Sequence, residues 1–221
     1  MQSEIKGGKA FSYVDMTLAP GETIITESDA MSSMDADLEM EAIFNGGFLR
    51  GLARKFFGGE SLFVSRFINP TDSPKRLTFT QGTPGEIRCL TLTGEPFHLQ
   101  PGAFIACEES VSLGLRWAGF VSWIGKEGLF KLEVSGHGKV WYGAFGALVD
   151  KEIDGEYIVD TGHLVAYDPG IKLKLQLAGG IFSSFFGGEG LVTRVEGKGK
   201  VVLQTRSLSG LAGWLNPKFW G

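Results

Sequence analysis

The feature that most constrains the fold is a sequence segment that occurs three times. Its copies occupy residues 56–63, 123–130 and 185–192, and each contains a glutamate next to glycine: Glu60, Glu127 and Glu189. A second landmark precedes each copy at similar spacing, at residues 29–35, 102–108 and 162–168. Two landmarks that keep one order in three copies indicate an internal repeat of about sixty residues, each copy forming one structural unit.

Within the copies, apolar and polar residues alternate. Residues 171–177 read Ile-Lys-Leu-Lys-Leu-Gln-Leu, and residues 38–42 and 130–135 alternate in the same way. Side chains of a strand point to opposite faces in turn, so this period predicts strands with one buried and one wet face. Gly-x-Gly at 136–138 and at 197–199 lies between strand-like runs, which predicts a tight hairpin turn at each place.

We therefore predict an all-β chain of three tandem antiparallel sandwich units arranged about a pseudo-threefold axis. The units span residues 1–84, with an apolar insertion at 43–57, then 85–150, then 151–207. The tail at 208–221 is rich in Leu, Trp and Phe, so we expect it to dock on the rest of the chain. Helix is expected only at 51–55 and 208–215.

Composition excludes several classes of protein. Hydrophobic residues make up 43% of the chain, enough for a packed core, and 33 glycines suit a fold with many turns. The net charge is −4 and Lys and Arg are scattered, so no basic stripe for nucleic acid is present. The chain shows neither a signal peptide nor an apolar run of the ~18 residues needed to span a bilayer, which favours the cytoplasm.

The two cysteines, Cys89 and Cys107, both lie in apolar strand-like runs. We read them as reduced core residues, with a disulfide between them as the alternative.

The loops before the three glutamates are unusually apolar. Their large apolar side chains include Phe44, Phe48, Phe56, Phe57, Phe120, Trp123, Ile124, Phe182, Phe185 and Phe186. One interpretation is that these loops fold inward over a central seam, as large apolar groups usually do. The other is that they form one exposed surface for another subunit, a partner or a membrane.

The titratable residues form no catalytic pattern. Glu60, Glu127 and Glu189 are interpreted as caps of glycine turns, with a cation site of three converging carboxylates as the alternative. His98, His137 and His163 lie in unrelated contexts without metal-ligand spacing, and His163 is expected to satisfy a local hydrogen bond. Ser61 has no nucleophile elbow around it. We expect no metal, no cofactor and a non-enzymatic role.

Five segments carry a resemblance to a known family. They are Pro-Gly-Glu at 20–22, Gly-Glu-Ser-Leu-Phe at 59–63, Asp-Thr-Gly-His-Leu-Val-Ala at 160–166, Phe-Gly-Gly-Glu-Gly-Leu-Val at 186–192 and Gln-Thr-Arg-Ser at 204–207. Together they resemble the mitochondrial-biogenesis family named for altered inheritance of mitochondria, and especially its bacterial relatives. The resemblance implies a fold like that of the tryptophan RNA-binding attenuator (TRAP-like), a short double-stranded β-helix. Eukaryotic members are linked to organisation of the mitochondrial inner membrane, but the resemblance implies no catalytic residues.

Two functional hypotheses follow. The first is a scaffold or assembly protein that acts through the apolar loops on the inner face of a bacterial membrane or on a protein partner, with a homo-oligomer among its expected forms. The second is a cupin-like β-helix domain that binds a small ligand or catalyses a reaction, since such barrels often enclose ligands. It predicts an enclosed pocket with converging polar groups.

Overall fold

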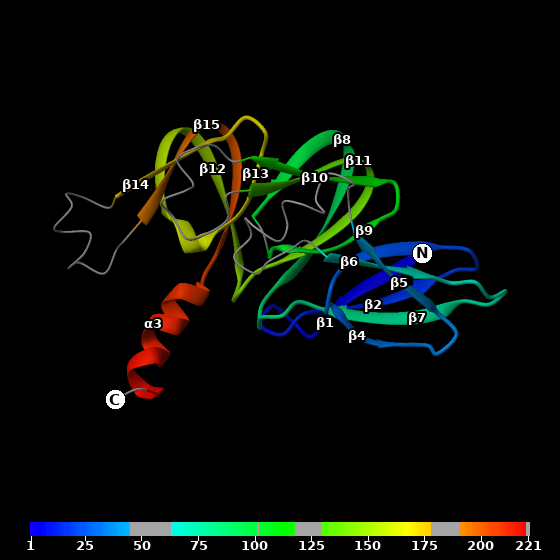
Figure 1. Cartoon of the computed structure of the whole chain (residues 1–221). Helices are drawn as coiled ribbons and strands as arrows, with labels where there is room; N and C mark the ends of the chain where they lie inside the picture. The colour runs from blue at the N-terminus through cyan, green and yellow to red at the C-terminus, as the bar shows by residue number, and fades with distance from the viewer. Residues whose placement is uncertain (45–62, 101, 118–129, 178–190, 220–221) are drawn as a thin grey trace.

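The computed structural model describes residues 1–44, 63–100, 102–117, 130–177 and 191–219 (Figure 1). Strands dominate it, which confirms the all-β prediction. The strands of the first part of the chain are β1 (Gln2–Lys6), β2 (Tyr13–Leu18), β3 (Thr23–Glu27), β4 (Met31–Met34), β5 (Glu39–Phe44), β6 (Phe63–Ile68) and β7 (Lys75–Thr80). The rest of the chain forms β8 (Ile87–Leu99), β9 (Phe104–Glu108), β10 (Val111–Trp117), β11 (Phe130–Gly143), β12 (Leu148–Asp160), the 3-10 turn η2 (Thr161–His163), β13 (Leu164–Tyr167), β14 (Lys172–Leu177), β15 (Leu191–Gln204) and helix α3 (Leu208–Phe219).

The described strands form two sheets. A four-stranded sheet has the order β1-β2-β7-β4, and an 11-stranded sheet has the order β12-β15-β13-β8-β11-β9-β3-β6-β5, with β10 on β11 and β14 on β15. Figure 1 shows β12 to β15 on the left, β8 to β11 in the middle and β1 to β7 on the right, with α3 below the left group. The chain therefore builds the fold in sequence order from one end to the other.

One pairing pattern occurs repeatedly. The long strand β11 pairs β8 along one edge, while β10 and then β9 pair successive halves of its other edge. Strand β15 has neighbours in the corresponding positions, with β12 along one edge and β14 and then β13 along the other. In the first part of the chain the long strand is divided into β6 and β7, which pair β3 and β5 and then β2 and β4. The unit boundaries and the pseudo-threefold arrangement stay predictions.

The division between β6 and β7 follows from the residues around it. Pro70 and Pro74 lie between the two strands and cannot donate to a ladder. Asn69 is fully buried at this break, and its Nδ2 donates to Leu18 O and Ser73 O, both at 2.9 Å. The buried amide therefore replaces part of the missing strand pairing.

The two Gly-x-Gly motifs are not hairpin turns, so that prediction was wrong. β11 runs through Gly136 and Gly138, and β15 runs through Gly197 and Gly199. The glycines have positive φ, 100° at Gly136 and 126° at Gly197. A Cβ at Gly197 would lie 2.5 Å from the carbonyl oxygen of Gly170, so glycine is needed where a neighbouring turn approaches the strand.

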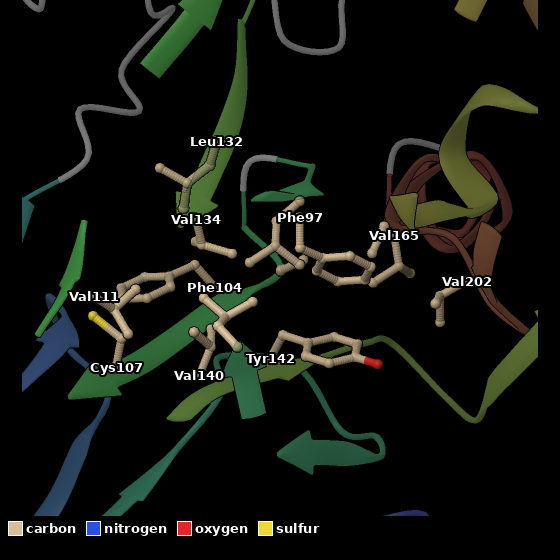
Figure 2. Close-up of a cluster of buried hydrophobic side chains, with 14 of the residues drawn as sticks. Phe97, Phe104, Cys107, Val111, Leu132, Val134, Val140, Tyr142, Val165 and Val202 are labelled. Carbon is tan, nitrogen blue, oxygen red and sulfur yellow. The ribbon is translucent and has the colours of Figure 1, made fainter. Parts of the chain in front are cut away.

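Apolar side chains fill the space between the strands. Figure 2 shows the largest cluster, in which Phe97, Phe104 and Tyr142 from β8, β9 and β11 lie among valines that include Val165 of β13 and Val202 of β15. A second cluster, which includes Phe79 and Trp141, packs β2, β3 and β7 against β9 and β11. The core therefore continues from one group of strands to the next.

The two cysteines occupy different environments, and both are free. Cys107 is fully buried in the core, as predicted. Cys89 is exposed on β8, so the prediction that it is a core residue was wrong. Strand alternation explains the difference, because Cys89 lies between Arg88 and Leu90, on the face of β8 that is open to solvent here.

Among the described helices, none has the length and apolar character required to cross a membrane.

Candidate functional surface

Most of the predicted site residues lie outside the described part of the chain. This holds for Glu60, Glu127 and Glu189, for the helix expected at 51–55, and for Phe48, Phe56, Phe57, Phe120, Trp123, Ile124, Phe182, Phe185 and Phe186. Phe44 is the last residue of β5. Neither the turn-cap and cation interpretations of the glutamates nor the exposure of the loops is tested, and both stay predictions.

The strands that border these loops are described, and they share one arrangement. Each loop connects two antiparallel strands: β5 to β6, β10 to β11, and β14 to β15. The last paired residues before the loops are Phe44↔Phe63, Trp117↔Phe130 and Leu177↔Leu191. All three apolar loops therefore begin and end at the open end of a strand pair.

Three carboxylates that we did not predict cap the second half of the long strands. Asp35 Oδ2 accepts a hydrogen bond from Arg76 N at 2.7 Å, Glu108 Oε2 from Lys139 N at 3.0 Å, and Asp168 Oδ2 from Lys200 N at 2.7 Å. Each carboxylate is the last residue of the second sequence landmark, which was the signal that could have identified them. Their bonds satisfy backbone N–H groups next to an irregular part of the ladder.

Removing one of these carboxylates should destabilise the fold. Asp168→Ala should lower the free energy of unfolding by about 1–2 kcal/mol, because Lys200 N loses its acceptor. Asp168→Asn should cost less, since the amide oxygen still accepts. Urea denaturation measures both values, with Asp154→Ala as the control, because Asp154 and its 3.4 Å partner Lys198 are both exposed. Equal losses for Asn and Ala would contradict this role.

Helix α3 carries more exposed large apolar side chains than any other described helix or strand. Leu208 is 58% exposed, Trp214 62% and Phe219 73%, and no described residue of α3 is buried. The prediction of a helix in the tail is confirmed, but the tail is not docked as expected. Ser207 begins the helix, since its Oγ accepts from Gly210 N at 3.1 Å, and the helix then extends away from the sheets (Figure 1).

Charged side chains near the starts of β8 and β12 form ion pairs and hydrogen bonds with one another and with the backbone. Glu86 is 7% exposed, its Oε2 accepts from Leu148 N at 2.9 Å, and its Oε1 accepts from Arg88 Nε at 3.0 Å. The Nη1 of Arg88 also donates to Asp150 at 2.9 Å. This network joins the start of β8 to the start of β12, so its geometry supports a structural role.

The three histidines are in separate environments. His98 is buried, with Nε2 3.3 Å from Glu133 Oε2 and its ring 5.0 Å from the ring of Tyr167. Burial raises the pKa of Tyr167. The Nδ1 of His163 lies 2.7 Å from Gln204 O, which confirms the expected local hydrogen bond, and His137 is exposed on β11. Within the described ranges, no group of three or more His, Cys, Asp or Glu residues is placed to hold a metal ion.

Comparison with known proteins finds one family over nearly the whole chain. The family described as Mitochondrial biogenesis AIM24 matches residues 3–206. An uncharacterised protein of Streptococcus pyogenes serotype M6 is 26% identical over 224 residues, which cover 97% of this chain and 90% of that protein. The crystal structure of another Streptococcus pyogenes protein superposes with a TM-score of 0.80 at 24% identity, over 98% of this chain and 99% of the other. The structural likeness is one of fold.

Proposed function

The chain belongs to the Mitochondrial biogenesis AIM24 family, and we propose that it is a non-enzymatic scaffold or assembly protein that presents apolar side chains to a membrane surface. The observation that carries the proposal is the exposed apolar surface of α3. In this proposal the protein is cytoplasmic and peripheral to the inner face of the membrane, and the apolar loops form further contacts. A large exposed apolar patch commonly marks an interaction site.

The chemistry of the tail suits a lipid interface. Residues 205–221 contain Arg206 and Lys218 and no acidic residue, although the whole chain has a net charge of −4. The Nζ of Lys218 lies 4.7 Å from the centre of the Trp214 ring. Trp and Lys are residues that anchor at the boundary between lipid headgroups and acyl chains, with the ring in the apolar layer and the cation near phosphate.

Binding to lipid vesicles tests the proposal. The full-length protein should co-sediment with vesicles of phosphatidylcholine and phosphatidylglycerol. Trp214→Ser/Phe219→Ser should weaken this binding by about tenfold or more, because two large apolar side chains no longer enter the interface. Phe11→Ser is the matched control, since Phe11 is an apolar residue of similar exposure (70%) outside α3, and its substitution leaves the helix intact.

The outcomes separate lipid from protein as the partner. If neither the native protein nor either variant sediments with vesicles, the membrane proposal is wrong, and unchanged binding of the double variant would reject α3 as the contact. A Trp123→Ser/Phe185→Ser/Phe186→Ser variant measures the contribution of the loops separately. Loss of a co-purifying protein from the variants without any vesicle binding would favour a protein partner.

The finer description of the fold also belongs to this proposal. We propose three TRAP-like units, at residues 1–84, 85–150 and 151–207, related by a pseudo-threefold axis. The recurring neighbours of β11 and β15 support the repeat, as do the three carboxylates at equivalent places in the pairing. The cupin-like alternative is not favoured by the described core, whose interior is occupied by apolar side chains (Figure 2).

A further inference from the structure

The apolar residues of α3 recur along one side of the helix. Those spaced three or four positions apart, which share a face at ~3.6 residues per turn, are Leu208, Leu211, Leu215 and Phe219. The opposite side has small or uncharged polar residues, which are Ser209, Gly213 and Asn216. The helix contains no acidic residue, and Lys218 is its one basic residue. A helix with one apolar side can lie in the plane of a lipid interface.

Two cations mark the ends of this helix. Arg206 shortly precedes α3, and Lys218 lies in its last turn. Helical residues rise by ~1.5 Å each, so the two cations are about 18 Å apart along the axis. Within the described part of the chain neither cation forms an ion pair, whereas Arg194 on β15 pairs with Glu156 at 2.9 Å. Arg206 and Lys218 are both exposed, so an external anion can reach them.

The start of α3 is hydrogen-bonded to two other parts of the fold. The Oε1 of Gln204 accepts from Phe145 N at 2.9 Å, and its Nε2 donates to Gly162 O at 2.8 Å. The Oγ1 of Thr205 accepts from Ala147 N at 2.9 Å. These bonds join the end of β15 to η2 and to the link between β11 and β12. A surface that binds α3 therefore also constrains the orientation of the strands.

Charge is distributed unequally between the two ends of the fold. The described residues 1–44 and 63–80, which form β1 to β7, contain ten acidic and five basic residues. Residues 205–221 contain two basic residues and no acidic residue. Figure 1 shows β1 to β7 on the right and α3 at the lower left. A negatively charged surface would attract the end that carries α3 and repel the end formed by β1 to β7.

We infer that α3 binds the surface of a bilayer that contains anionic glycerophospholipids, with Arg206 and Lys218 at the phosphate groups and β1 to β7 directed away from the bilayer. This inference rests on the proposed function and specifies its lipid class and orientation. The helix lies along the interface, its apolar side enters the acyl-chain layer, and the two cations stay at the level of the headgroups. Zwitterionic lipids supply the same apolar layer without a net charge, so lipid charge should determine the affinity.

Vesicles that differ only in lipid charge test the lipid class. At about 0.1 M salt, vesicles with about one third phosphatidylglycerol should bind the native protein at least about tenfold more tightly than phosphatidylcholine alone. Arg206→Gln/Lys218→Gln should bind both kinds within about twofold, because the apolar side remains and the attraction of two cations is lost. Lys9→Gln/Arg76→Gln is the matched control, since both residues are exposed at the β1 to β7 end, and it should keep the native preference. About 1 M salt, which shortens the screening length to ~3 Å, should remove that preference.

Acetylation of lysines by a water-soluble amine-reactive ester measures the orientation. On anionic vesicles Lys218 should react at least about tenfold more slowly than in the free protein, because the interface covers it. Lys9, in the turn between β1 and β2, should react at the same rate in both states. Slower reaction of Lys9 without slower reaction of Lys218 would overturn the orientation.

The outcomes separate this inference from the proposed function. Equal binding of the native protein to both kinds of vesicle would overturn the inference and leave the proposed membrane contact intact. Absence of binding to either kind would overturn both. A preference that Arg206→Gln/Lys218→Gln retains would mean that other cations respond to lipid charge, which also overturns the inference. Unchanged circular dichroism and melting temperature show that the variants are folded.

Discussion

In the native protein at about pH 8, iodoacetamide should modify Cys89 quickly and leave Cys107 unmodified. The reactive species is the thiolate, and Cys107 is fully buried. Burial, with a smaller contribution from the nearby Glu108 carboxylate, raises the pKa of Cys107 to about 12. Its thiolate fraction at this pH is then about one in ten thousand, compared with about one in four for an ordinary thiol. Together with the closed packing, this should slow the reaction at Cys107 by more than a thousandfold, about the ratio of the thiolate fractions.

Mass spectrometry of the peptides that contain each cysteine measures the two rates. In denaturant both cysteines should react at similar rates, and Cys89→Ser should leave almost no rapid modification in the native state. Although Cys89 is exposed, partial desolvation by its neighbours on the sheet raises the pKa of its thiol, so its reaction should accelerate with rising pH. Rapid native modification of Cys107 would show that the contact between β3 and β9 opens readily, since Cys107 lies opposite Ile25 there.

Trp141→Ala should lower the free energy of unfolding by about 3–5 kcal/mol, a large share of the stability of a domain of this size. Trp141 is fully buried and its ring lies 6.0 Å from the ring of Phe79 at an interplanar angle of 83°. It belongs to the core cluster that packs β9 and β11 against β2 and β7. The substitution leaves a cavity where two groups of strands meet, so neither group can close it alone.

Equilibrium urea denaturation followed by circular dichroism measures this loss. Trp214→Ala is the matched control, because Trp214 is 62% exposed on α3 and its removal should change stability by less than about 0.5 kcal/mol. Similar losses for the two variants would mean that Trp214 packs against the protein in solution, and that the helix is not open as described.

Strands were predictable from the sequence where apolar and polar residues alternate and the apolar face of the strand packs against the core. In β14, Leu173 and Leu175 are partly buried between exposed Lys172 and Lys174, as the sequence period indicates. In β5 the same period fails, because Met40 is 55% exposed on a strand that ends the sheet. Alternation identifies two faces of a strand, but not whether another layer covers the apolar one.

The candidate site was less predictable for similar reasons. Gly-x-Gly allows either a turn or a close approach to a strand, and only the position of Gly170 beside Gly197 decides between them. The second landmark drew attention to its apolar residues, while its final carboxylates, such as Asp168, make the hydrogen bonds. The apolar tail was expected to dock because such residues are usually buried, yet α3 leaves Trp214 exposed.

The order of the strands also affects how the chain can fold as the ribosome makes it. In the groups β8 to β11 and β12 to β15, the last strand to emerge is the one that pairs with every other strand of its group. Each group must wait for its final strand, but it need not wait for the next group. The nascent chain can therefore complete its groups of strands one after another, which limits how much unpaired strand is exposed at any moment during synthesis.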